Sequence, residues 1–263
     1  MPRSHTSLSD DDAVERRFQA VAFRQFRALL RKDIVSELRT REMIASMFLF
    51  VVLAMIVFHY AFTVHGGGSG SSGFGGTGTG SGTGDLSLFA GGMLWVVFVF
   101  GALLGLNRSF AHEKDEGCLD GLLLCPVDRV TIFLAKMTAN LIFLGIIQVL
   151  AVPLFLVIFA SGRVAAHLPA FFALIVLADL GIAALGTLVA TISMNTRARD
   201  LLLPILFLPL AIPLLIAAAS GTSTVFSGAA AGGSLLSRLV FLLVYDGVLL
   251  VLAYGTYDFA IGE

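Results

Sequence analysis

One polar stretch interrupts an otherwise apolar sequence: Asn107 to Arg129, which reads NRSFAHEKDEGCLDGLLLCPVDR and lies between two long apolar runs. Four charged residues stand side by side within it, from Glu113 to Glu116. A charged side chain in the bilayer core costs about 2.5 to 3.5 kcal/mol even on the lenient insertion scale, so this stretch must face water. The mostly apolar pattern from Cys118 to Cys125 predicts a short helix with an apolar face, which Pro126 ends.

The composition places the rest of the chain in a membrane. The sequence has 263 residues, of which 57% are hydrophobic and only 13% charged, and many of its apolar runs are too long for soluble helices. The first residues are polar and acidic and lack the apolar core of a cleavable signal, so residues 1–15 are predicted to be a disordered acidic tail. The net charge of -1 identifies no partner, because the charges are segregated along the chain.

Residues 16–42 have the periodicity of an amphipathic helix. Apolar residues recur about one turn apart, at Phe18, Ala22, Phe26, Leu30, Ile34 and Leu38. Basic residues occupy the other faces, which is typical of a helix that lies in the headgroup plane of the lipid bilayer. The alternatives are a solvated basic helix and a nucleic-acid-binding stripe. Because a membrane span follows directly, we expect contact with the bilayer and none with nucleic acid.

Six apolar runs follow, and residues 43–263 are predicted to form one membrane domain. The runs are Ser46–Val64, Leu86–Leu106, Val130–Ala160, Leu168–Met194, Leu201–Ala219 and Leu239–Phe259. Each can cross about 30 Å of hydrocarbon at about 1.5 Å per residue, although the third is so long that it must tilt or bend. Pro204, Pro209 and Pro213 predict that the fifth is kinked or broken. The predicted fold class is an all-α integral membrane protein with six transmembrane helices.

The positions of Lys and Arg give the orientation. Nine basic residues precede the first span and four surround residues 107–129, whereas only Arg163 and Arg238 lie on the opposite side. By the positive-inside rule, both termini and the loop of residues 107–129 are cytoplasmic. Residues 66–84, rich in Gly, Ser and Thr, are predicted to be an external flexible linker. Their GxGxxG match is no dinucleotide site, because no strand precedes it and no helix opens after it.

Four residues in the predicted spans are candidates for a polar translocation route: Trp95 in the second, Asp179 in the fourth, and Tyr245 and Asp246 in the sixth. Intramembrane acids usually face the protein interior, find a partner and mark a pathway. The alternative is that these side chains make hydrogen-bonded structural contacts.

Small residues in two spans predict close helix packing. Gly101 and Gly105 have GxxxG spacing in the second span, and Gly181 and Gly186 lie in the fourth. Such residues let helix backbones approach, either within one chain or at a subunit interface. For either span taken alone, we predict that its small residues serve helix packing within one chain.

The sequence contains no recognisable catalytic or metal-binding motif. It lacks GxxxxGK[ST], HExxH and GxSxG, and its histidines and two cysteines lack the spacing of metal ligands. A cluster of Glu113, Asp115, Glu116 and Asp120 could bind a divalent cation, but Lys114 lies within it and a solvated helical turn accounts for it better. We therefore expect no catalytic site, no metal site and no ATP-binding loop in this chain.

The stretch from Gly92 to Phe159 resembles the haem exporter protein B family, CcmB, the permease subunit of the cytochrome c maturation ABC complex. More loosely, the polar stretch is similar to the cytoplasmic loop of ABC-2 type permeases. That similarity is carried by Glu113, Glu116, Gly117, Leu119, Leu122, Pro126 and Lys136. The extension before Phe18 and the glycine-rich linker depart from the family pattern.

The resemblance implies an ABC-2 type permease fold and a homodimer bound to two copies of a separate ATP-binding subunit. ATP and Mg would then bind to that subunit, and this chain would be no enzyme and hold no cofactor of its own. Haem is the candidate cargo, or a haem-loaded chaperone is released instead. The location implied is the bacterial inner membrane, beside other cytochrome c maturation membrane proteins.

The resemblance also implies a coupling role for the helix predicted in the polar stretch, His112–Leu124, here called the coupling helix. Its leucines Leu119, Leu122 and Leu123 would sit in a groove of the ATPase, with Glu113 and Glu116 at the rim. Buried apolar side chains give affinity in such an interface, whereas rim charges set its register. Closure of the ATPase would push this helix and tilt the spans on either side of it.

Three hypotheses for function follow. The first is an ABC permease subunit for cytochrome c maturation. The second is a permease of the same fold that exports another lipid, drug or ion. The third is a proton-coupled carrier that uses Asp179 and Asp246 and needs no ATPase. A membrane enzyme built on the acidic cluster is a more distant fourth.

Overall fold

The computed structural model describes residues 23–36, 42–66, 84–115, 129–159, 168–194, 199–226 and 233–260, and all of these residues are helical. The all-α prediction is therefore confirmed for the described part of the chain. The predicted acidic tail of residues 1–15, residues 67–83 of the predicted linker and the part of the coupling helix beyond Asp115 lie outside it.

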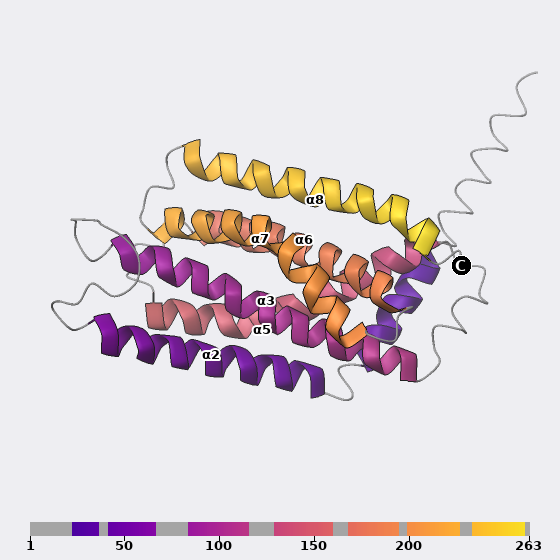
Figure 1. The fold of residues 1–263 in the computed structure, drawn as a ribbon, viewed down its shortest axis with the longest axis horizontal. Helices are drawn as coiled ribbons and strands as arrows, with labels where there is room; N and C mark the ends of the chain where they lie inside the picture. The colour runs from indigo at the N-terminus through magenta and orange to yellow at the C-terminus, as the bar shows by residue number, and fades with distance from the viewer. Residues whose placement is uncertain are drawn as a thin grey trace, which may run out of the picture.

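Six long helices form one bundle. They are α2 (Glu42–Gly66), α3 (Gly84–Asp115), α5 (Arg129–Phe159), α6 (Leu168–Met194), α7 (Arg199–Phe226) and α8 (Gly233–Ala260). Figure 1 shows them side by side along one axis, with consecutive helices running in opposite directions. Because of this alternation, α3 ends and α5 begins at the end of the bundle where α8 finishes.

A shorter helix of residues 23–36, here called the N-terminal helix, lies at that same end (Figure 1). It is the described part of the amphipathic helix predicted for residues 16–42. Its Leu29, Leu30 and Ile34 are partly buried and pack against the core of the bundle, whereas Arg27 and Arg31 are exposed. The apolar positions recur at helical spacing, so one face packs on the bundle and the basic face points away.

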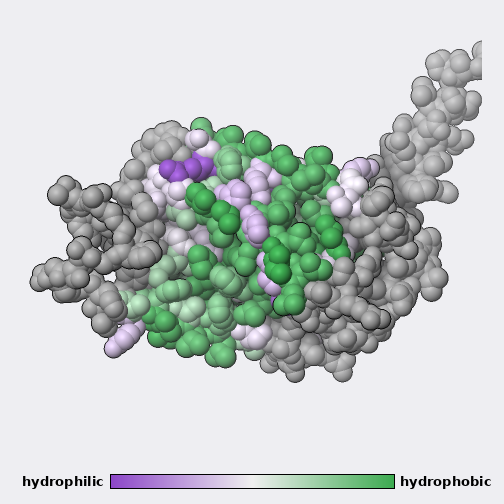
Figure 2. Space-filling model, in the orientation of Figure 1, coloured by the Kyte–Doolittle hydropathy of each residue, from purple (hydrophilic) through white to green (hydrophobic). Residues whose placement is uncertain are grey.

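Five of the long helices are long and apolar enough to cross a membrane. Their candidate spans are Ile44–Ala61, Val130–Val157, Leu168–Ser193, Leu201–Phe226 and Leu235–Thr256. The remaining predicted span, the second (Leu86–Leu106), falls in α3, whose apolar part among the described residues is the shorter stretch Gly91–Asn107. Hydrophobic side chains cover most of the described surface on the face drawn in Figure 2. The chain is thus a multi-pass membrane protein, whose described residues contain five candidate spans of full length and one shorter apolar helix.

The centre of the bundle is α6. In its candidate span 72% of the residues are buried, against 17% in α2 and 22% in α8, and it packs against α3, α5, α7 and α8. Small residues permit these contacts. A Cβ atom on Gly186 would lie 2.4 Å from Leu106 Cδ1 of α3, and one on Gly181 would lie 2.2 Å from Leu214 Cδ1 of α7. Both glycines of the fourth span therefore serve packing within the chain, as predicted.

The three prolines of α7 do not break it. The helix is continuous from Arg199 to Phe226 and contains Pro204, Pro209 and Pro213. Of the two predicted alternatives, a kinked or a broken fifth span, the break is therefore wrong and the kink stays a prediction. Neighbouring helices tolerate the loss of backbone hydrogen bonds at such prolines, and α7 has α3, α6 and α8 against it.

Candidate functional site

Of the residues predicted to couple the chain to an ATPase, only Lys136 has a described side chain. The backbone of Glu113 lies in the last turn of α3, but its side chain is outside the described residues, as are Glu116, Gly117, Leu119, Leu122 and Pro126. Their roles stay predictions.

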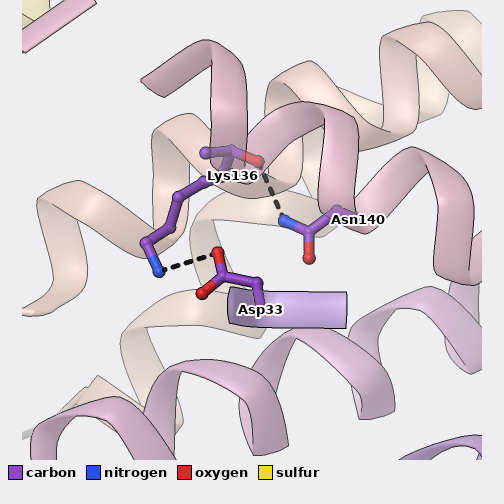
Figure 3. A network of polar contacts seen from close by, with 4 residues as sticks. Asp33, Lys136 and Asn140 are labelled. Carbon is purple, nitrogen blue, oxygen red and sulfur yellow. Dashed lines mark hydrogen bonds and ion pairs between the residues drawn. The ribbon is translucent and has the colours of Figure 1, made fainter. Parts of the chain in front are cut away.

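Lys136 joins α5 to the N-terminal helix. Its Nζ lies 3.6 Å from Oδ2 of Asp33, and the two side chains are only 12% and 13% exposed (Figure 3). Asp33 is the only acidic residue in the N-terminal helix. A single acid among basic residues could have indicated, from the sequence alone, that it forms an ion pair with another helix. The ion pair fixes the N-terminal helix beside the start of α5, close to where the polar stretch re-enters the bundle.

Two hydrogen bonds between buried side chains connect α5 and α6. Asn140 Nδ2 donates to Thr187 Oγ1 over 3.0 Å, and Gln148 Nε2 donates to Asp179 Oδ1 over 2.6 Å. The donors are eight residues apart on α5 and the acceptors eight apart on α6, as antiparallel helices in one register require. Figure 3 shows Asn140 on the helix that carries Lys136. Asp179 therefore has a hydrogen-bond partner within the bundle.

Asp246 of α8 is the unusual acid. Its side chain is 3% exposed, and neither carboxylate oxygen has a hydrogen-bond partner among the described residues. It faces Gly181 of α6, where an added Cβ would come within 2.4 Å of Oδ1. A buried polar group without a partner is costly, so Asp246 has binding capacity that the described part of the chain does not use.

Tyr245, next to Asp246, makes a different contact. Its hydroxyl donates to the carbonyl oxygen of Leu210 in α7, and its ring stacks on Phe241, with centroids 6.3 Å apart. Leu210 follows Pro209, and the carbonyl of Pro209 has no helical donor because Pro213, four residues later, lacks an N–H. Tyr245 thus supports the proline-containing part of α7 from α8.

Trp95 joins α3 to α7. It is fully buried, and its Nε1 donates to Thr222 Oγ1 over 2.8 Å. The ring also meets Phe98 edge-on, with centroids 5.9 Å apart. One turn earlier, a Cβ on Gly91 would lie 3.0 Å from the carbonyl oxygen of Ala219, so the two helices are in close contact there.

The four predicted polar residues therefore do not converge on one site. Asp179 contacts α5, Trp95 and Tyr245 contact α7, and Asp246 contacts α6. Among the residues that the structure describes, no group of three or more His, Cys, Asp or Glu side chains could hold a metal ion. The described helices therefore contain several polar contacts between helices, and one buried acid, Asp246, whose carboxylate oxygens have no hydrogen-bond partner there.

A bundle of antiparallel apolar helices with polar pairs buried between them has the architecture of a multi-pass membrane protein. The chain belongs to the CcmB family, since the family model described as "CcmB protein" matches residues 74–262. The resemblance predicted from Gly92–Phe159 is confirmed, and the match extends it over most of the bundle.

The similar proteins are named heme exporter protein B. The one from Rhodobacter capsulatus is 35% identical over 136 residues, which are 50% of this chain and 59% of the relative. The one from Paracoccus denitrificans is 33% identical over 169 residues, 64% of this chain and 74% of the relative. The one from Pseudomonas aeruginosa is 29% identical over 151 residues, 57% and 67% of the two chains. The chain thus matches less than two thirds of the Rhodobacter relative.

Proposed function

We propose that this chain is the membrane permease subunit of an ABC transporter complex in cytochrome c maturation, which exports haem or releases a haem-loaded chaperone. The observation that carries the proposal is membership of the CcmB family, together with relatives named heme exporter protein B. The chain would work in the bacterial inner membrane with both termini in the cytoplasm, and beside other cytochrome c maturation membrane proteins.

In this proposal a separate subunit hydrolyses ATP, two copies of it bind a homodimer of this chain, and the coupling helix receives the motion. Leu119 and Leu122 seat in the ATPase, and α3 and α5, on either side of the polar stretch, carry the displacement into the bundle. The Asp33–Lys136 ion pair supports one detail: the N-terminal helix would move together with the start of α5.

The coupling role is tested by Leu119→Asp with Leu122→Asp. We expect this double variant to lose co-purification of the ATP-binding subunit while still inserting in the membrane, because two charges would enter an apolar interface. The matched control is Val35→Asp on the N-terminal helix, a 53% exposed apolar residue at the same end of the bundle, which should leave co-purification intact. A double variant that keeps its ATPase refutes the coupling role.

The substrate is tested in a strain that lacks the chain. We expect absorption spectra of its membranes to lose the bands of c-type cytochromes, since haem would not be attached. Unchanged haem attachment removes cytochrome maturation and leaves an ABC-2 type exporter of another lipid, drug or ion.

A proton-coupled carrier is the second candidate, favoured by the carboxyl of Asp246, which is buried and has no hydrogen-bond partner within the described helices. It predicts transport by the purified chain without an ATPase, and loss of that transport in Asp179→Asn or Asp246→Asn. The ABC proposal instead predicts no transport by the chain alone. A vesicle assay with and without the ATPase subunit separates the two.

A further inference from the structure

A groove opens between α7 and α8 at the end of the bundle where α8 begins. Its volume is about 630 Å³, and its walls include Pro213, Ile216 and Ser220 of α7 and Ser237, Arg238 and Phe241 of α8. Ile216 and Phe241 are 64% and 48% exposed, so the groove is open to the side of the bundle. Figure 2 shows a hydrophilic spot near the start of α8 with hydrophobic side chains beside it.

Arg238 is the charged residue of this groove. It lies one turn inside the span Leu235–Thr256, and its Nε is buried without a hydrogen-bond partner among the described residues. The stem of the side chain lies against α7, with Cδ 3.9 Å from where a Cβ on Gly221 would be. Within the described part of the chain it has no ion pair either.

The sequence at this end of the bundle offers few anions. Residues 67–83, 160–167 and 227–232, which join the helices here, contain no Asp or Glu. Asp85, at the start of α3, is the acid closest in sequence to these segments. A guanidinium whose Nε is buried without a partner is suited to an anionic ligand, and its planar fork of N–H donors matches phosphate oxygens.

We propose that the groove binds one anionic phospholipid of the bilayer. Its phosphate would accept hydrogen bonds from the Arg238 guanidinium and the Ser237 hydroxyl, and an acyl chain would lie over Ile216 and Phe241. Three observations favour lipid over a soluble anion. The groove opens sideways, its outer wall is apolar, and Arg238 lies one turn from the end of its span, which is headgroup depth. The site requires neither an ATPase nor a cargo.

The test uses the full chain, purified and delipidated in detergent, with Phe241→Trp as the reporter. The only native tryptophan, Trp95, is fully buried and contributes a constant signal. Brominated phosphatidylglycerol should quench the introduced indole at a concentration about tenfold lower than brominated phosphatidylcholine, because only the former is a net anion. Adding Arg238→Gln should bring the two lipids to equal potency, and Arg238→Lys should keep part of the preference.

The matched control is Asp85→Asn. If Asp85 were the partner of Arg238, this variant would alter the preference for the anionic lipid; we expect no change. Equal quenching by the two lipids in the Phe241→Trp variant with native Arg238 overturns the proposal. This comparison does not depend on Arg238→Gln, so the proposal can be tested even if that variant does not fold. A preference that survives Arg238→Gln also overturns it.

A further experiment tests whether the groove binds lipid or the candidate cargo, haem. Native mass spectrometry counts phosphatidylglycerol bound to the chain, and haem is then added. Bound lipid should persist. Displacement of the lipid by haem would mean that the groove takes a carboxylated porphyrin, and the lipid proposal would fail while the transport proposal gained support.

Discussion

Gly181 sets the distance between α6 and its two neighbours, so replacing it by alanine should loosen the centre of the bundle. The added Cβ would lie 2.2 Å from Leu214 Cδ1 and 2.4 Å from Asp246 Oδ1. Ordinary carbon contacts are about 3.5 to 4.0 Å, so both side chains must retreat by more than about 1 Å. Leu214 and Asp246 are 0% and 3% exposed, so both side-chain ends would have to move within the packed interior of the bundle.

The magnitude follows from two opposing terms. Overpacking of a filled core costs typically about 1 to 3 kcal/mol, and a contact this short belongs at the upper end. Alanine recovers about 1 kcal/mol through its higher helix propensity. The net loss should be about 2 kcal/mol, which lowers Tm by roughly 4 to 8 °C in a protein of this size.

Gly247→Ala is the matched control, because the same change in α8 meets nothing within 4 Å. It should keep or slightly raise Tm. Both variants would be heated in detergent, and the monodisperse fraction measured by size-exclusion chromatography at each temperature. If Gly181→Ala melts at the temperature of Gly247→Ala, the close packing of α6 described above is incorrect.

Two further predictions concern the contacts between helices. Charge reversal at Asp33→Lys or Lys136→Asp should lower stability, and the double swap should restore most of it. At 3.6 Å the Coulomb energy of the pair is about 1 kcal/mol in water and about 5 kcal/mol at a dielectric constant near 20. The free energies of unfolding, measured by SDS titration in a double-mutant cycle, should therefore give a coupling of about 1 to 2 kcal/mol. Trp95→Phe should cost about 1 to 2 kcal/mol by removing the hydrogen bond to Thr222, and Thr222→Val added to it should cost little more; additive losses would contradict that pairing.

Much of the fold follows from the sequence, because an apolar run in lipid must satisfy its backbone groups within a helix. The predicted fourth span, Leu168–Met194, is α6 as the structure has it. The fifth was predicted to end at Ala219, but α7 continues to Phe226. The polar residues there stay helical because their hydroxyls donate to carbonyls about one turn earlier, as Thr222 does to Ala218.

The start of α8 was also placed wrongly. The sixth predicted span began at Leu239, directly after Arg238, whereas α8 begins at Gly233. A long arginine side chain can lie along apolar surface with its head near water, so it need not end a span.

The candidate site was only partly predictable. Intramembrane charge and aromaticity indicated Asp179, Asp246 and Trp95, but not which helix each would meet, because partners far apart in sequence leave no local pattern. Gln148 is such a partner of Asp179. One signal was available: Asn140 and Gln148 are eight residues apart, and so lie on nearly the same face of α5.

The two bonds between α5 and α6 have a mechanical consequence. Since both bonds share one register, sliding one helix along the other by a single turn would break them together, and in one direction it would leave Asn140 opposite Ala183 and Gln148 opposite Ile175. Shifts of less than one turn form no new hydrogen bond in exchange. We therefore expect α5 and α6 to move together as one rigid unit. On the other side of α6, the Asp246 carboxylate of α8 makes no hydrogen bond to any residue that the structure describes, so we expect movement during a transport cycle to occur between α6 and α8.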